Sequence, residues 1–307
     1  MTSNVDVTLV TYEDGPEISA DDALLVDALH RRGLTTRAAV WSDPGVDWVR
    51  SRVTIIRSTW DYFHRPDEFT AWLAAIDQLT RVINPAETLL WNMDKRYLQE
   101  LEAGGLRIVP TIFAEEADAE LAGRRLASTD VVIKPTISGA AFGTRRFDLK
   151  SDLAAASDHL AAMIRRGGAM VQPYLPAVAG EGERSLVFLA GEFSHAYVKR
   201  PFGGMAGTDS RPTIPHEPTS DEIAFAFSVL KTSGKVAHYA RVDIIPDVAG
   251  PMLMELELIE PALFFSVRAE SADLLAGEIA ALVAKPGAPE GPLIDGDQRP
   301  VNLAQVA

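Results

Sequence analysis

The sequence predicts an α/β protein whose first part is βα-layered and whose remainder is α+β. Three strand-like runs, at residues 5–11, 37–41 and 53–59, alternate with helical segments near the N-terminus. Later strand-like runs instead follow one another across short turns, which is typical of antiparallel hairpins. A parallel sheet followed by antiparallel sheets is therefore expected.

Length and charge limit the classes of function. A chain of 307 residues fits two or three packed subdomains, and its 47% hydrophobic and 23% charged content is ordinary for a globular protein. The net charge of -14 argues against sequence-independent nucleic-acid binding, which needs clustered basic residues.

Targeting signals and cysteines are both missing from the sequence. No apolar run reaches the roughly 18 residues of a membrane helix, and the first residues lack a secretory pattern, so we expect a cytoplasmic protein without a membrane partner. The absence of cysteine excludes disulfides, thiolate metal sites and cysteine nucleophiles.

The first strand and its neighbours predict a ligand site other than a dinucleotide site. The turn after residues 5–11 has no G-x-G-x-x-G, which argues against nicotinamide or flavin. The third strand ends in RSTWDY, where open α/β sheets place ligands, so Arg57 and Asp61 are candidates for contacting a charged substrate. Alternatively, the two side chains pair with each other or cap the following helix.

A lysine at a predicted helix start is a second candidate. Asn92 is a plausible N-cap and Gly104 with Gly105 a stop signal, which places Lys95 in the first helical turn. A bound phosphate would suit both this lysine and the free N–H groups of the turn. The alternative is a solvated lysine beside Asp94.

The segment 131–147 combines a strand, a lysine and a loop of small residues. Because Lys134 precedes the loop and the loop leads to another strand, this is not a P-loop. Small residues still let the main chain approach a phosphate chain closely. The alternative is a tight surface hairpin with an incidental lysine. The loop residues of interest are Ser138, Gly139, Ala140 and Gly143.

The next segments predict a connection, a hairpin and a loop. Residues 172–175 read as an inter-domain hinge, and a hairpin turns near Gly191. Residues 201–215 form a long glycine-bearing loop, and Thr219 with Glu222 begins a capped helix.

Three carboxylates are predicted to converge near the C-terminus. Glu255 and Glu257 project to one face of a strand, and Asp243 joins them if the register of its neighbouring strand allows. Like charges this close require a cation, and oxygen ligands suit Mg²⁺ bridging phosphates. The alternative, a solvated polar face, is disfavoured by the apolar neighbours.

The order of these parts resembles the ATP-grasp superfamily, closest to its glutathione synthetase and glutamate-ligating branch, over about residues 5–285. The resemblance implies a Rossmann-like N-terminal domain at 1–90, a small central lid subdomain at 91–170, a C-terminal antiparallel-sheet domain at 171–285 and a flexible tail at 286–307. It also implies ATP and Mg²⁺ as cofactors.

The resemblance assigns roles to individual residues. Lys95 and Lys134 resemble the phosphate-contacting lysines, with Lys134 also catalytic, and 138–143 resembles the mobile loop over the triphosphate. The metal ligands implied are Asp243, Glu255 and Glu257, although many relatives carry asparagine where Glu257 stands. The implied adenine and ribose contacts are Gln172, Tyr174, Leu175 and Glu183.

Within the superfamily, RSTWDY, WNMDKRYLQEL and MELELIEPALFF look like the small group that contains a D-cycloserine-forming cyclo-ligase. The resemblance implies ATP-driven closure of O-ureido-D-serine through an acyl phosphate, and no histidine is required. The alternatives are a two-substrate carboxylate-amine ligase, a small-molecule kinase and, least favoured, a non-catalytic nucleotide-binding module.

The expected partner is a small amino-acid-like substrate, and a homo-oligomer is compatible with the sequence. A guanidinium can hold a carboxylate or acyl phosphate through two hydrogen bonds. Arg241, which shares a strand face with Asp243, is the foremost catalytic candidate. The other basic candidates for substrate binding are Arg184, Lys199, Arg200 and Arg268.

Overall fold

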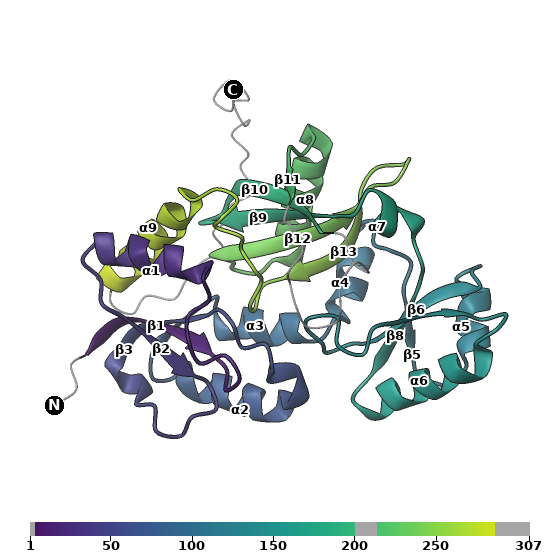
Figure 1. The fold of residues 1–307 in the computed structure, drawn as a ribbon, viewed down its shortest axis with the longest axis horizontal. Coiled ribbons are helices and arrows are strands. Elements are labelled where there is room, and N and C mark those ends of the chain that lie inside the picture. Colours follow the sequence, from purple (N-terminus) through teal and green to yellow (C-terminus); the bar gives the residue numbers. More distant parts are fainter. Residues whose placement is uncertain (1–3, 200–213, 286–307) are drawn as a thin grey trace.

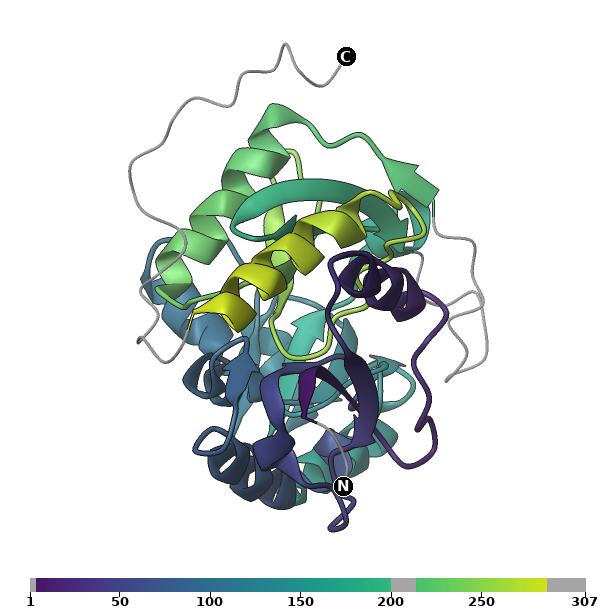
Figure 2. The same cartoon turned by 90° about the vertical axis from the view of Figure 1, so that its left-hand side faces the viewer.

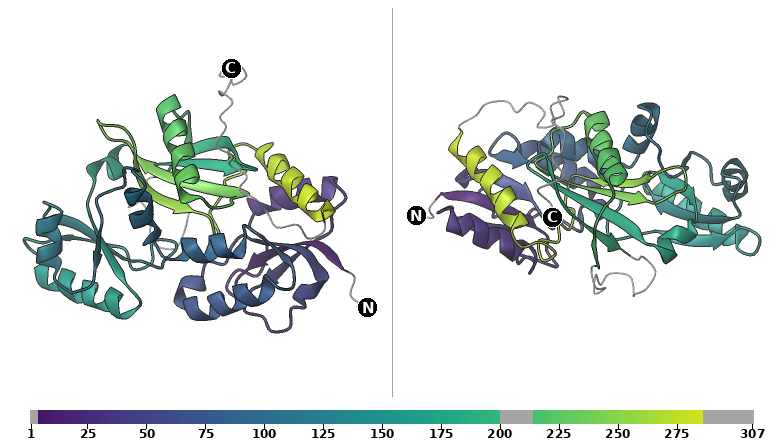
Figure 3. Two further views of the ribbon diagram at one scale, coloured as in Figure 1. Left: turned by 180° about the vertical axis from the view of Figure 1, so that it is seen from behind. Right: turned by 90° about the horizontal axis from the view of Figure 1, so that it is seen from above.

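The computed structural model describes residues 4–199 and 214–285. Arg200, most of the predicted glycine-bearing loop and the predicted tail at 286–307 lie outside the described residues. The described chain forms three sheets: the N-terminal sheet and the small central unit lie at opposite ends, with the C-terminal sheet between them (Figures 1 and 3).

The N-terminal sheet is parallel, as predicted, with strand order β2-β1-β3-β4. Its strands are β1 (Val5–Thr11), β2 (Thr36–Val40), β3 (Ser51–Ile56) and β4 (Arg81–Ile83). The associated helices are α1 (Asp22–Arg31), α2 (Pro66–Ile76) and α3 (Ala86–Met93), with short 3-10 turns at Trp48–Arg50 and Tyr62–His64.

The last helix of the described chain, α9 (Ser271–Ala284), returns to this first sheet and lies beside α1 (Figure 2). Successive residues of β1 point to opposite faces, so Leu9 packs with α1 and α9 while Val10 packs with α2. Both faces of the sheet are thus covered, which explains why consecutive residues of its two inner strands, β1 and β3, are buried.

The central unit is a four-stranded antiparallel sheet with strand order β5-β8-β6-β7. Its strands are β5 (Ile112–Ala114), β6 (Asp130–Pro135), β7 (Arg145–Asp148) and β8 (Ala169–Pro173). Its apolar core is closed by two helices, α5 (Ala119–Arg125) and α6 (Leu153–Arg165).

The C-terminal sheet is also antiparallel, with strand order β11-β10-β9-β12-β13. Its strands are β9 (Glu183–Leu189), β10 (Glu192–Lys199), β11 (Ile214–His216), β12 (Tyr239–Ile245) and β13 (Met252–Glu257). One face packs against α4 (Tyr97–Ala103) and α8 (Ser220–Ser233), and α7 (Pro176–Gly180) connects this part to the central unit.

The helix starts were predicted with mixed success. Thr219 and Glu222 form the predicted capping box of α8. The predicted N-cap at Asn92 is wrong, because Asn92 lies within α3 and hydrogen-bonds the backbone of Leu256 and Leu258. Lys95 therefore precedes α4 instead of occupying its first turn. None of the helices within 4–199 and 214–285 is both long and apolar enough to cross a membrane.

Candidate active site

The face of the C-terminal sheet opposite α4 and α8 carries the predicted carboxylates. In the antiparallel register of β12 and β13, Asp243 lies opposite Glu255, and Arg241 lies opposite Glu257. Since side chains alternate along a strand, all four project to one face. This is the register that the predicted site requires, and we call these four residues the carboxylate face.

Asp243 is the most completely buried member of this face. Arg241 Nε lies 3.0 Å from its Oδ1, Lys199 Nζ lies 2.6 Å from its Oδ2, and the Ser185 hydroxyl donates to it at 2.6 Å. Burial alone would raise the pKa of Asp243, but Arg241 and Lys199 outweigh it and hold the pKa well below its usual range. Asp243 is therefore a fixed anion.

The two cations that bind Asp243 are each shared with a second carboxylate. Lys199 also pairs with Glu183 at 2.6 Å, which connects the predicted ribose contact to Asp243. Arg241 also pairs with Glu257. Burial raises the pKa of Glu183 although Lys199 opposes this.

Lys95 joins the carboxylate face to the small-residue loop. Its Nζ lies 3.0 Å from Glu255 Oε1 and donates to the carbonyl of Ser138 at 2.7 Å. Its backbone N–H donates to Thr136 in the same loop at 2.9 Å. Lys95 is 5% exposed, and its ammonium lies against the loop. A phosphate that contacts this ammonium would therefore also contact the loop backbone.

Lys134 approaches the same face from β6. Its Nζ lies 4.0 Å from the sulfur of Met254, and within the described residues no carboxylate lies at ion-pair distance from it. Burial lowers the pKa of Lys134 even though Glu255 acts in the opposite direction. Lys134 thus lies near the carboxylates, and no carboxylate of the described segments forms an ion pair with it.

The loop after β6 is tightly folded. Ala140 and Ala141 adopt φ of 48° and 59°, and Gly143 has φ of 69°, where a Cβ would lie 3.0 Å from both Pro135 and Met163. Phe142 stacks near Phe63 of the N-terminal part at a centroid separation of 5.3 Å. The loop is therefore in contact with both end units of the molecule.

The predicted hinge lies where β8 leaves the central unit. The Gln172 amide donates to the Thr111 hydroxyl at 2.8 Å, and the backbone N–H of Tyr174 donates to Asp130 at 2.8 Å. The Arg146 guanidinium lies 3.4 Å from the centroid of the Tyr174 ring. Leu175 follows and packs near Val178 in a small apolar cluster.

Two predicted substrate residues, Arg57 and Asp61, have protein partners away from the carboxylate face. Arg57 is 2% exposed and pairs with Asp22 at 2.8 Å, whereas Asp61 accepts from Trp41 Nε1 at 2.7 Å and from Arg65. The alternative that Arg57 and Asp61 pair with each other is therefore wrong.

The remaining arginine candidates also have protein partners. Arg184 pairs with Glu222 and Glu181. Arg268 pairs with Glu270 and donates to the carbonyl of Ser194. Of the described substrate candidates, only Arg241 and Lys199 contact the carboxylate face.

Sequence reasoning missed Ser185 and Glu260. Ser185 lies opposite Asp243 in the pairing of β9 with β12, a relationship that only the sheet order reveals. Glu260 follows Glu257 by three residues, immediately before Pro261, and this third acidic residue at the strand end was a usable signal. Its carboxylate oxygen lies 3.5 Å from the position that a Cβ on Gly139 would take.

Acidic groups outnumber cations in this region. Burial, with Glu255 and Asp243 adding to it, raises the pKa of Glu257 to about 7 despite Arg241. Burial and Glu257 raise the pKa of Glu260 to about 8. The cations are Lys95, Lys134, Lys199 and Arg241, against Glu183, Asp243, Glu255, Glu257 and Glu260.

The three acidic residues of the carboxylate face, Asp243, Glu255 and Glu257, offer oxygen ligands, which fit a hard cation such as Mg²⁺. Within the described part of the chain, however, no three acidic or histidine side chains already form a metal-binding group. Glu255 is bound to Lys95, and Glu257 is bound to Arg241. Metal binding therefore requires these pairs to open or the carboxylates to bind both partners.

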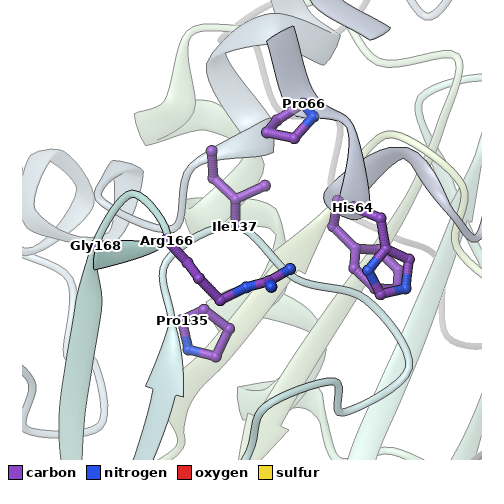
Figure 4. A pocket seen from close by; sticks show the side chains of 7 residues that line it. His64, Pro66, Pro135, Ile137, Arg166 and Gly168 are labelled. Atoms are coloured by element: carbon purple, nitrogen blue, oxygen red, sulfur yellow. The ribbon is translucent and has the colours of Figure 1, made fainter. Parts of the chain in front are cut away.

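A separate cavity of about 240 Å³ lies between the N-terminal part and the central unit (Figure 4). None of the predicted site residues lines it. Pro135, which does, is consecutive with Lys134 in β6 and so points to the opposite face. The lining residues are Phe63, His64, Pro66, Pro135, Ile137, Arg166 and Gly168.

The arrangement of the sheets and the lysine-carboxylate face define an ATP-grasp protein. A solved ATP-grasp ligase, PsnB with a minimal precursor, Mg and ADP, has the same fold, with a TM-score of 0.61, 17% identity and coverage of 92% of this chain and 100% of that chain. The crystal structure of D-cycloserine synthetase DcsG superposes with a TM-score of 0.80, at 28% identity over 90% of this chain and 99% of that chain.

Comparisons of the amino-acid sequence identify the family within the ATP-grasp proteins. A family model described as the N-terminal domain of D-cycloserine synthetase DcsG matches residues 7–84. The cycloserine biosynthesis protein DcsG of Streptomyces lavendulae is 32% identical over 275 residues, which cover 84% of this chain and 92% of the relative. The chain belongs to the DcsG family of ATP-grasp ligases.

Proposed function

We propose that this protein uses ATP to close O-ureido-D-serine into D-cycloserine. The observation that carries the proposal is the position of Lys95, which contacts both Glu255 of the carboxylate face and Ser138 of the loop. A γ-phosphate bound there would lie between a cation, loop N–H groups and metal-binding oxygens. The alignment over most of both chains with a relative named for cycloserine biosynthesis supports the choice of substrate.

The nucleotide would lie between the central unit and the C-terminal sheet. Gln172, Tyr174 and Leu175 are proposed to contact the adenine, and Glu183 the ribose. Lys95, Lys134 and the backbone of 138–143 would hold the phosphates. Asp243, Glu255 and Glu257 would hold Mg²⁺, which supplies positive charge against the phosphate oxygens when bound.

The reaction can be written as two displacements and a hydrolysis. The substrate carboxylate attacks the γ-phosphorus, the bond to ADP breaks, and an acyl phosphate forms. The ureido nitrogen bonded to oxygen then attacks the acyl carbon, loses its proton and displaces phosphate. Water removes the carbamoyl group from that nitrogen as carbon dioxide and ammonia, which leaves the five-membered ring.

The residues of this chain would act by position and charge. Lys134 has no carboxylate partner among the described residues. We propose that its ammonium stays in contact with the phosphoryl group while that group is transferred. Arg241 is held by Asp243 and Glu257 and is proposed to bind the acyl phosphate or substrate carboxylate. Because nucleophile and electrophile belong to one molecule, closure gains from proximity and needs no second amine.

The test is to incubate the protein with ATP, Mg²⁺ and O-ureido-D-serine and to follow ADP release and product mass. D-cycloserine with stoichiometric ADP is the expected result. A stable phosphorylated product would indicate a kinase. Joining of some other acid and amine, with no cyclised product, would indicate a two-substrate ligase and overturn the proposal.

A further inference from the structure

Glu260 is held at the junction of all three parts of the molecule. Its neighbours are fixed on both sides: the carbonyl of Ile259 accepts from the Tyr239 hydroxyl at 2.8 Å, and that of Pro261 accepts from Arg57 at 3.0 Å. Its Oε1 lies 3.5 Å from the position that a Cβ on Gly139 of the loop would take, and the ring of Phe63 of the N-terminal part lies 3.0 Å from the same position. The position of this carboxylate is therefore set by the fold.

Among the residues that the structure describes, no cation is paired with the carboxylate of Glu260. In residues 4–199 and 214–285 no lysine, arginine or histidine lies at ion-pair distance from it, and the nearby cations serve other acids. Burial and the charge of Glu257 raise the pKa of Glu260 to about 8. Glu260 is half-buried, and a partly desolvated acid without a partner costs stability, so an acid that served only the fold would ordinarily be paired or replaced.

Two consecutive loop residues relate Glu260 to the phosphate site. The carbonyl of Ser138 accepts from Lys95, and Gly139 adjoins Glu260. If the carboxylate of a substrate meets the γ-phosphate near Lys95, the carbon bonded to that carboxylate would lie near Glu260. Any group attached to this carbon could then contact Glu260. In an α-amino acid that next carbon carries an ammonium group.

We propose that Glu260 binds the ammonium group of an amino-acid substrate and selects it over acids that lack this group. This assignment rests on the proposed ligase function and extends it to a specificity-determining residue. The ammonium supplies the missing counter-charge, and Glu260 fixes the amino acid so that its carboxylate points toward the phosphate.

The experiment compares O-ureido-D-serine with the matched acid that carries hydrogen in place of the amino group. Wild-type protein, Glu260→Gln and Glu260→Asp are assayed with both acids, and kcat/KM is read from ADP release. Glu260→Gln should lose about ten- to a hundredfold of the preference for the amino form, the range of one charge-assisted hydrogen bond. Glu260→Asp should recover part of it, and the KM for ATP should not change.

Controls separate this role from a structural or metal-binding one. Glu192→Gln, an exposed glutamate in β10, should keep the full preference. The thermal midpoint of Glu260→Gln should equal or exceed that of the wild type, because a neutral amide replaces a half-buried acid that has no cation partner among the described residues. An unchanged preference in Glu260→Gln, or a raised Mg²⁺ requirement with the preference intact, overturns the assignment.

Failure of the cyclo-ligase proposal has a different signature. If wild-type protein does not convert O-ureido-D-serine, the same comparison is made with the acid that stimulates ADP release in a screen of amino acids and their deaminated counterparts. If Glu260→Gln then loses the preference for the amino form, the role of Glu260 in binding the ammonium group is supported although the cyclo-ligase proposal is not. A wild-type protein that prefers the deaminated acids overturns both.

Discussion

Lys95 and Glu255 form an ion pair of 3.0 Å between the segment before α4 and strand β13, and the same lysine also holds the loop carbonyl of Ser138. The lysine is nearly buried, so its charge acts with little screening by solvent. This one side chain connects the groups proposed to bind metal with those proposed to bind phosphate.

Replacing Lys95 should therefore impair nucleotide use. In Lys95→Ala we expect kcat/KM for ATP to fall by about a hundredfold or more, because one donor to the phosphates and one support of the loop are lost. Steady-state ADP release with varied ATP measures this. Lys150→Ala, at an exposed lysine after β7, is the matched control and should behave as wild type.

Lys134→Ala should act on turnover and leave the fold unharmed. Burial lowers the pKa of this lysine, and no described carboxylate loses its ion pair when it is removed. We expect a loss of kcat of about a hundredfold or more, with an unchanged thermal midpoint. Near wild-type ADP release in both Lys134→Ala and Lys95→Ala would contradict the phosphate assignment.

The two glutamates of β13 should differ in their response to Mg²⁺. Glu255 lies opposite Asp243, whereas Glu257 lies opposite Arg241 and already carries a raised pKa, about 7, caused mainly by burial. Glu255→Gln should lose most Mg²⁺-dependent activity, and Glu257→Asn should keep much of it. Activity titrated against Mg²⁺ distinguishes them, and equal losses would argue against different roles.

The sequence predicted the carboxylate face because it depends on a local rule. Side chains alternate along a strand, so Glu255 and Glu257 had to share a face, and one register placed Asp243 beside them. The order of strand, lysine and small-residue loop was equally local. The family resemblance then supplied the roles, which the arrangement of the residues alone does not assign.

Long-range contacts were beyond the same reasoning. Arg57 was expected to meet substrate, but its partners Asp22 and Pro261 are far from it in the sequence. The packing of α9 on the N-terminal sheet is likewise absent from any local pattern, because its apolar face would suit any sheet. The helix start expected at Asn92 failed because tertiary hydrogen bonds to β13 use that side chain instead.

Stability should fall in mild acid because of His195. Its Nε2 contacts the carbonyl of Leu263 at 2.8 Å, and burial lowers its pKa below the ordinary 6.5. Below about pH 6.5 the unfolded chain binds a proton that the native state does not, so stability is lost as the pH falls through this value, by up to about 1.4 kcal/mol per pH unit.

The variant His195→Gln removes the titratable imidazole but keeps a side-chain N–H that can donate to the carbonyl of Leu263. Urea unfolding at pH 7.5 and 5.5, chosen on either side of about 6.5, should show a smaller drop for the variant than for wild type. An identical drop in the two proteins would show that His195 does not contribute to acid sensitivity.

Arg57 and Asp22 should behave as a buried structural pair. Both side chains are almost fully buried, and Arg57 Nε lies 2.8 Å from Asp22 Oδ1. Arg57→Met leaves that carboxylate buried and unpaired, so we expect a loss of about 3–5 kcal/mol of unfolding free energy. Arg57→Met combined with Asp22→Asn should recover part of this loss, because the amide keeps its bond to Ser19 without a buried charge.

Denaturant unfolding of both single variants and the double variant gives the coupling energy between Arg57 and Asp22. If Arg57→Met is as stable as the wild type and has a greatly raised KM for the amino-acid substrate, Arg57 binds the substrate and is not a purely structural residue.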